Sequence, residues 1–118
     1  MSRTALAIAA ALVCIACLQP AFPQSGSRLA YIYDHAGIIS EDYEALIDDY
    51  VRRVDANTTA EIVIYTIPSF VGHGITKDGV EIQDRDMLAN YIFNEVSLDG
   101  IVGIGKEGKD NGVLILYS

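Results

Sequence analysis

The sequence predicts one small α/β domain, and three features carry that prediction. A helix-period pattern covers residues 41–55, a β-branched apolar run covers residues 60–67, and a second apolar run covers residues 113–117. Strands that alternate with helices in this way are typical of an α/β sandwich. A length of 118 residues leaves room for one such domain at most.

The first helix is the clearest element of the sequence. Ser40 is a good N-cap residue, and acids follow it in the first turn, where the helix dipole favours them. Apolar side chains then recur every three or four residues, which predicts one buried stripe. The stripe consists of Tyr43, Leu46, Ile47, Tyr50, Val51 and Val54. The opposite side carries Asp48, Asp49 and Asp55 and is expected to face solvent.

Strands and loops are expected on both sides of this helix. Residues 29–33 form an apolar, aromatic run that suits a short strand or an extended lead-in. The run at 60–67 is apolar almost without alternation, which favours a strand buried on both faces. Residues 69–84 are expected to form a long loop, and a second helix is expected from about Asp84. A glycine-spaced stretch, residues 100–112, leads into the last strand.

Residues 1–24 have the layout of a secretory signal. One arginine precedes an apolar run from residue 5 to residue 18, and a polar stretch with two prolines follows. That run is shorter than the roughly 20 apolar residues of a transmembrane helix. A retained N-terminal anchor and a lipid-bearing Cys17 are the alternatives. We expect a linker at residues 25–28, a folded domain at residues 29–118, and a secreted or otherwise extracytoplasmic protein that associates with membranes.

The charge and cysteine counts exclude several classes of protein. Residues 25–118 carry seven Lys or Arg against sixteen Asp or Glu, which argues against binding to nucleic acid. Both cysteines lie in the apolar run of the leader, so we expect no disulfide scaffold, no Cys-ligated zinc and no iron–sulfur cluster. His35 and His73 are 38 residues apart and lack the spacing of a zinc site. No haem is expected either.

The glycine-rich stretch matches two nucleotide-binding patterns only in part. Residues 103–108 read G-x-G-x-x-G, and residues 103–109 match the beginning of a P-loop. Both motifs present backbone N–H groups at the start of a helix, whereas this loop precedes a strand. Asp110 also stands where a P-loop has Ser or Thr. We therefore expect no nucleotide cofactor.

Polar residues of the same loop are candidates for a ligand or metal site. Asp110 and Asn111 could offer oxygens to a hard cation, and Lys106 or Lys109 could hold an anion. Asp34 follows a strand-like run and is the second metal candidate. The alternative for the loop is a plain Asx turn, and for Asp34 it is capping of the loop before the helix. Because open α/β sheets collect ligands at strand ends, Asp34 and Asp110 are expected to share a pocket.

Two parts of the chain resemble the TPM-domain family. The first is YDHAGIIS at residues 33–40, followed by the acidic helix and by EIVIYTIP at residues 61–68. The second is the stretch from GIGK to KDNGVLIL at residues 103–116. The resemblance covers residues 29–118 and implies a three-layer α/β/α sandwich around a small mixed sheet. Family members usually continue with another strand, a glycine-rich turn and a helix, so it also implies a domain that is incomplete at its C-terminus.

The resemblance implies two functions of different classes. Some members bind calcium, so Asp34 and Asp110 would hold Ca²⁺, ahead of Mg²⁺. The first hypothesis is an exported binding or assembly module, which supports or modulates a membrane protein complex or acts on another extracytoplasmic protein. The second is a metal-assisted acid phosphatase acting on phosphomonoesters. Only two metal ligands and no general acid can be nominated, which favours the module and leaves enzymatic activity open.

Overall fold

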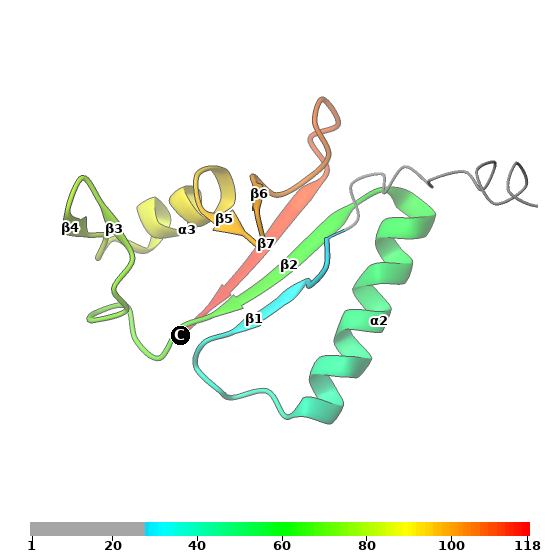
Figure 1. Ribbon diagram of the computed structural model, residues 1–118, viewed down its shortest axis with the longest axis horizontal. Coiled ribbons are helices and arrows are strands. Elements are labelled where there is room, and N and C mark those ends of the chain that lie inside the picture. The colour runs from blue at the N-terminus through cyan, green and yellow to red at the C-terminus, as the bar shows by residue number, and fades with distance from the viewer. Residues whose placement is uncertain (1–27) are drawn as a thin grey trace, which may run out of the picture.

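The computed structural model describes residues 28–118, which contain a central sheet, two helices and two short hairpins (Figure 1). The signal or anchor expected at residues 1–24 and most of the linker lie outside the described residues. In chain order the elements are β1 (Ile32–Asp34), α2 (Glu41–Thr58), β2 (Glu61–Thr66), β3 (Thr76–Lys77), β4 (Val80–Glu81), α3 (Arg85–Asn94), β5 (Ser97–Leu98), β6 (Ile101–Val102) and β7 (Gly112–Tyr117). The predicted α/β class is confirmed.

The central sheet has three parallel strands in the order β1-β2-β7. Asp34 pairs with Thr66 at the carboxyl end of the sheet, and Glu61 pairs with Gly112 at the amino end. Antiparallel pairing is confined to the hairpins β3-β4 and β5-β6. Among the residues described, β1 and β7 are the two edges of the central sheet.

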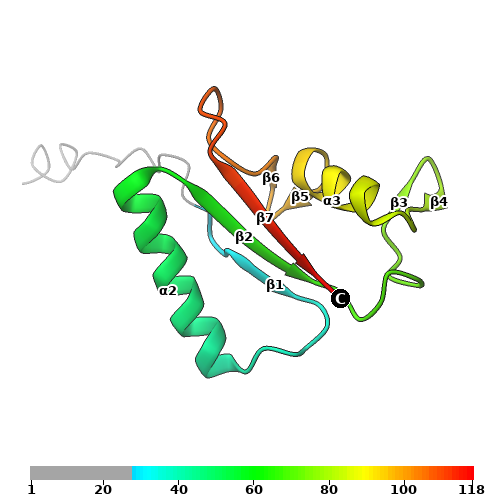
Figure 2. The ribbon, with the colours of Figure 1, turned by 180° about the vertical axis from the view of Figure 1, so that it is seen from behind.

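The two helices lie on opposite sides of the sheet, with α2 beside β1 and β2 and α3 beside β7 (Figures 1 and 2). The main core lies on the α3 side. Its buried members are Val63, Tyr65, Ile67, Ile82, Leu88, Ile92, Leu98 and Ile104. Leu114 and Leu116 of β7 pack against this core. None of the helices within residues 28–118 has the length and apolar character needed to cross a bilayer.

The helix limits follow the predicted caps. The Ser40 hydroxyl accepts a hydrogen bond from the Tyr43 backbone N–H at 3.4 Å, and the Asp84 carboxylate accepts one from the Met87 N–H at 2.9 Å. The first helix continues one turn beyond the predicted end at residue 55 and reaches Thr58. It stops there because Thr59 adopts a left-handed conformation with φ of 64°.

The expected long loop and the glycine stretch each contain a hairpin that the sequence analysis did not predict. Asp78 and Gly79 form one turn, and Asp99 and Gly100 form the other, with positive φ at all four residues. Asp-Gly pairs favour such turns because both residue types tolerate positive φ. Two-residue strands are too short to show alternation in the sequence, which explains why they were missed.

The orientation predicted for the first helix is confirmed at Val51, which is buried, but is wrong at other positions. Asp48 and Asp55, expected in solvent, face the rest of the domain: Asp48 accepts from the Tyr31 backbone N–H, and Asp55 is buried. Tyr43 and Tyr50, expected in the core, are 65% and 63% exposed. This side of the helix is turned toward residues 28–31, to which Asp48, Asp55 and Arg52 form hydrogen bonds.

Candidate binding surface

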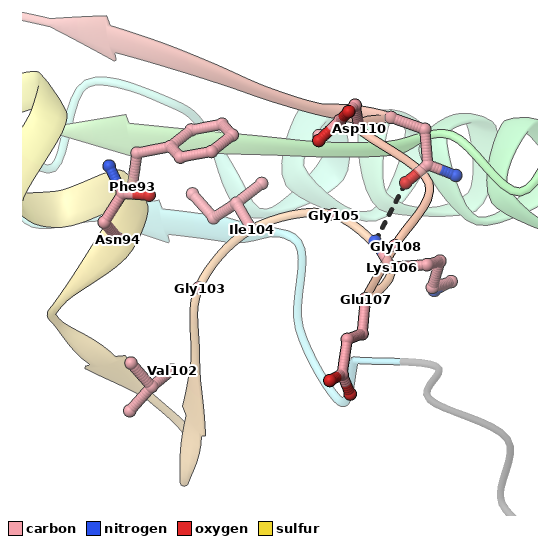
Figure 3. A pocket seen from close by; sticks show the side chains of 12 residues that line it. Phe93, Asn94, Val102, Gly103, Ile104, Gly105, Lys106, Glu107, Gly108 and Asp110 are labelled. Atoms are coloured by element: carbon pink, nitrogen blue, oxygen red, sulfur yellow. Dashed lines mark hydrogen bonds between the residues drawn. The ribbon is translucent and has the colours of Figure 1, made fainter.

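The glycine stretch forms an open loop over the amino end of β7. A hollow of about 530 Å³ lies between this loop and the end of α3 (Figure 3). It is lined by Phe93, Asn94 and residues 102–108 and 110–112. The loop passes very close to β7, because a side chain on Gly112 would meet the Ile104 carbonyl oxygen at 2.3 Å.

Asn111 fastens this loop to the end of α2. Its side-chain oxygen accepts a hydrogen bond from the Lys106 backbone N–H at 2.8 Å (Figure 3). Its side-chain nitrogen donates to the Thr59 carbonyl oxygen at 2.6 Å. Both ends of its amide thus bond to other parts of the chain, but neither bond is that of an Asx turn, in which the side-chain oxygen accepts from the N–H two residues later.

Lys106 belongs to a cluster of charged side chains at the amino end of the sheet. Its ammonium lies 2.9 Å from the Asp55 carboxylate and 3.5 Å from the Glu61 carboxylate. Arg28 donates to Glu61 and to the Gly103 carbonyl oxygen, and both Arg28 and Glu61 are 2% exposed. Two cations and two anions meet here, which offsets the desolvation that burial imposes on each charge. The positive charge of Lys106 is therefore balanced by carboxylates of the protein itself.

The remaining candidates of this loop lie at its exposed tip. Lys109 donates its backbone N–H to the Lys106 carbonyl oxygen at 3.0 Å, and its side chain is exposed. Asp110 is exposed and has a φ of 48°, a conformation that aspartate tolerates better than most residues. These two side chains stay accessible to a ligand.

Asp34 organises the loop at the other end of the sheet. Its carboxylate accepts hydrogen bonds from the Ile39 N–H at 2.8 Å, from the Ile38 N–H at 3.3 Å and from the Thr66 hydroxyl. The Thr66 hydroxyl, followed by the Ile39 N–H, lowers the pKa of this carboxyl below its ordinary value. The capping interpretation accounts for these contacts.

The structure does not bring Asp34 and Asp110 into one pocket. Asp34 is at the level of Thr66, and Asp110 precedes Gly112, which is at the level of Glu61. Those levels are five residues apart along β2, or roughly 17 Å at about 3.3 Å per residue. The sequence predicted that both aspartates lie at strand ends. Asp34 lies at the carboxyl end of the parallel sheet and Asp110 at its amino end, a difference that the sequence alone does not show.

Residues 28–118 contain no group of three His, Cys, Asp or Glu side chains able to hold a metal ion. Cation binding by either aspartate alone stays a prediction.

A different surface lies on the α2 side of the sheet. Leu114 and Leu116 point toward the α3-side core, so the alternate residues of β7 point to the opposite side. These are Val113, Ile115 and Tyr117, which are 47%, 48% and 58% exposed. α2 packs on β1 and β2, and no element within residues 28–118 covers the apolar row of β7.

The flank of α2 that faces β7 is apolar as well. Arg52 donates to the carbonyl oxygens of Arg28 and Leu29, at 3.1 and 2.6 Å, so the flank that carries Arg52 faces the β1 side. Tyr50 is two residues from Arg52, and about 160° separates the two around the helix. Tyr43 and Tyr50 therefore lie on the flank away from Arg52, and both are more than 60% exposed. Leu46, nine residues from the buried Asp55, points away from the sheet.

We call five exposed apolar residues of these two elements the apolar trough: Tyr43, Tyr50, Val113, Ile115 and Tyr117. β7 forms its floor and α2 forms one wall. The sequence analysis found the α2 part as a pattern but assigned it to the core. The signal that could have corrected this assignment is the set of polar residues Asp48, Arg52 and Asp55, which have the same helical spacing.

Comparison with known proteins agrees with the resemblance seen in the sequence. A family model described as the TPM domain matches residues 32–118. No curated protein and no solved structure matches the chain. The family match begins at the first residue of β1 and includes both helices and every strand described above. The protein therefore belongs to the TPM-domain family.

Proposed function

We propose that this protein is an exported binding module that docks onto another protein through the apolar trough. The supporting observation is the trough itself, to which α2 contributes two exposed apolar side chains and β7 contributes three. Large contiguous apolar surface is costly in water and marks interaction sites on soluble domains. The secretory layout of residues 1–24 supports export, and the family resemblance supports a role in a membrane protein complex.

A site-specific crosslinking experiment tests this function. A photoreactive phenylalanine at position 50 or position 115 should give one common crosslinked product in the cell. The same group at Val80 or Met87, which are 70% and 62% exposed, serves as the matched control. We expect no such product from the control positions. Equal products from all four positions, or none from positions 50 and 115, would contradict docking through the trough.

Divalent-cation binding is a second part of the proposal. Asp110 is the better candidate because its carboxylate lies at an exposed loop tip, whereas the Asp34 carboxylate already accepts three hydrogen bonds. Calcium that binds the folded state raises the melting temperature. We expect a rise that Asp110→Asn abolishes and that the isosteric Asp34→Asn leaves in place. Unchanged melting temperature at millimolar calcium would remove cation binding from the proposal.

The phosphatase alternative receives less support from the geometry. It requires Asp34 and Asp110 to hold one cation, yet they lie at opposite ends of the sheet. In this alternative Lys109 would neutralise the charge of the phosphoryl group beside that cation. A phosphomonoesterase assay with Ca²⁺ or Mg²⁺, wild type beside Asp110→Ala, tests it. Metal-dependent turnover that the substitution removes would overturn the binding module as the main function.

A further inference from the structure

We propose that residues 28–31 form a strap that couples α2 to the glycine loop, residues 103–111, so that displacing the strap loosens the loop and opens the hollow beside it. The inference goes beyond the proposed function, because it concerns the amino end of the sheet and not the apolar trough. Two sets of contacts carry it: those between α2 and the strap, and those between the strap and the loop.

Side chains of α2 fix the path of the strap. Arg52 donates hydrogen bonds to the carbonyl oxygens of Arg28 and Leu29, at 3.1 and 2.6 Å. The Asp48 carboxylate accepts one from the Tyr31 backbone N–H at 3.3 Å. The helix thus satisfies three backbone groups ahead of β1, which holds the strap at the amino end of the sheet.

The strap in turn holds the glycine loop at two points. The Arg28 guanidinium donates to the carbonyl oxygen of Gly103. The Tyr31 hydroxyl donates to the Asp55 carboxylate, and the Lys106 ammonium lies 2.9 Å from the same carboxylate. Arg28 is 2% exposed and Tyr31 is fully buried, so both contacts are shielded from water. Because Gly103 and Lys106 line the hollow, the strap fixes part of its wall.

The backbone of the loop gives it little rigidity of its own. Gly103, Gly105 and Gly108 all have positive φ. Glycine has more accessible backbone conformations than other residues, so a released loop with several glycines gains much conformational entropy. Segments of this kind open locally at a lower free energy than the core does. Loss of the strap should therefore open the loop before it unfolds the rest of the domain.

Coupling of this kind acts in both directions. A ligand that moves Gly103 or Lys106 from its place in the wall of the hollow would loosen the strap by the same free energy. The strap is also the point where the chain enters the described domain, so a pull on the segment before residue 28 would reach the loop. Residues 28–31 thus regulate access to the hollow.

Amide hydrogen exchange of the full chain tests the coupling, with Arg52→Gln as the substitution. Within residues 28–118, Arg52 bonds to the strap and to Asp48, so it reaches the loop only through its neighbours. We expect the hydrogen-bonded loop amides to exchange about 10-fold faster, and to accelerate at least about 5-fold more than the amide of the fully buried Leu88. These loop amides are those of Ile104, Lys106 and Lys109.

Arg53→Gln is the matched control. Arg53, like Arg52, pairs with an aspartate four residues earlier, Asp49 at 2.6 Å, but it is exposed and lies off the strap. We expect it to change exchange in the loop less than about 2-fold. Equal acceleration of the loop and of Leu88 by Arg52→Gln would show that the strap stabilises the whole domain alike, and would overturn the coupling. Unchanged exchange in the loop would overturn it too.

The amide of Thr59 separates the strap from a second route to the loop. Asn111 fastens the loop to the end of α2, and the Thr59 N–H donates to the Asp55 carbonyl oxygen at 2.7 Å in that last turn. Under the proposal, Arg52→Gln leaves exchange at Thr59 within about 2-fold of the wild type. Acceleration at Thr59 equal to that of the loop would trace the effect to α2 and overturn the role of the strap.

The reverse direction is tested from the loop. Lys106→Gln should make the Tyr31 amide exchange about 5-fold faster, because it removes the charge that holds the Asp55 carboxylate beside the Tyr31 hydroxyl. Lys109→Gln, at the exposed tip of the loop, is the control and should leave that amide within about 2-fold of the wild type. Equal exchange of the Tyr31 amide in the two variants would overturn the proposal. This comparison also decides it if Arg52→Gln fails to fold by circular dichroism.

Discussion

Both faces of β7 are apolar, yet only one of them is covered. On the α3 side, Leu114 packs against a core that contains Leu88, which is fully buried. On the α2 side, Ile115 of the same strand is half exposed. Neighbouring residues of one strand thus differ in burial although both are apolar. The difference in burial comes from what packs on each face of the strand and not from the composition of the strand. Within residues 28–118 the apolar row on the α2 side therefore stays exposed.

The largest loss of stability is expected from removing the buried ion pair between Arg28 and Glu61. Glu61→Ala should lower the free energy of unfolding by about 3–5 kcal/mol, because it leaves Arg28 buried without its carboxylate. Urea denaturation measures the change. The control is Glu95→Ala, which removes an exposed ion pair with Lys77 and should cost less than about 1 kcal/mol. Similar losses for the two variants would show that the charges at the amino end are hydrated.

A second prediction compares the two faces directly. Leu88→Ala should lower the free energy of unfolding by about 2–5 kcal/mol, because it opens a cavity in the core. Ile115→Ala, on the uncovered face, should cost no more than about 1 kcal/mol. Both values come from urea denaturation of the same protein preparation. A cost for Ile115→Ala above about 2 kcal/mol would mean that its face is covered in solution.

Local signals in the sequence predicted most of the fold. Ser40 and the acids after it mark the start of α2, and the β-branched residues within 60–67 mark β2. Both signals depend on local interactions, and the tertiary structure keeps both elements. The continuous apolar character of β2 also predicted burial on both of its faces. The face that carries Val63 and Tyr65 is buried, whereas Ile62 and Ile64 on the other face are half-buried.

The candidate site was less predictable because it depends on long-range arrangement. Asp34 and Asp110 both follow or precede a strand, and the sequence does not say which ends of two strands meet. The rotation of α2 depends on Arg52, whose bonds to the backbone of residues 28 and 29 exist only in the folded chain. Periodicity identified the apolar side chains correctly but could not tell a covered flank from an uncovered one.

A smaller effect is expected at the crossing between the glycine loop and β7. Gly112→Ala should cost about 1–3 kcal/mol, since its new methyl group would overlap the backbone of Ile104, a member of the α3-side core. Gly108→Ala is the control: its φ of 74° is strained for alanine, but the added methyl group meets open space. Thermal unfolding should show a lower melting temperature for Gly112→Ala than for Gly108→Ala. A lower melting temperature for Gly108→Ala would mean that the glycine loop does not pack closely against β7 at Gly112.

The smallest effect concerns the ionisation of Tyr33, which packs against the covered side. Burial, together with the hydrogen bond from its hydroxyl to Asp99 at 2.9 Å, raises the pKa of Tyr33 to about 12. The ordinary value is about 10, so the contribution of the neutral phenol to stability is complete below pH 10 and is lost as the pH rises through about 12. Phenolate absorbance should therefore show a late step that Tyr33→Phe removes. Asp99→Asn should move that step toward lower pH without restoring the ordinary value, because burial remains. A Tyr33 step at pH 10 in the wild type would mean that water reaches this side as freely as it reaches the trough.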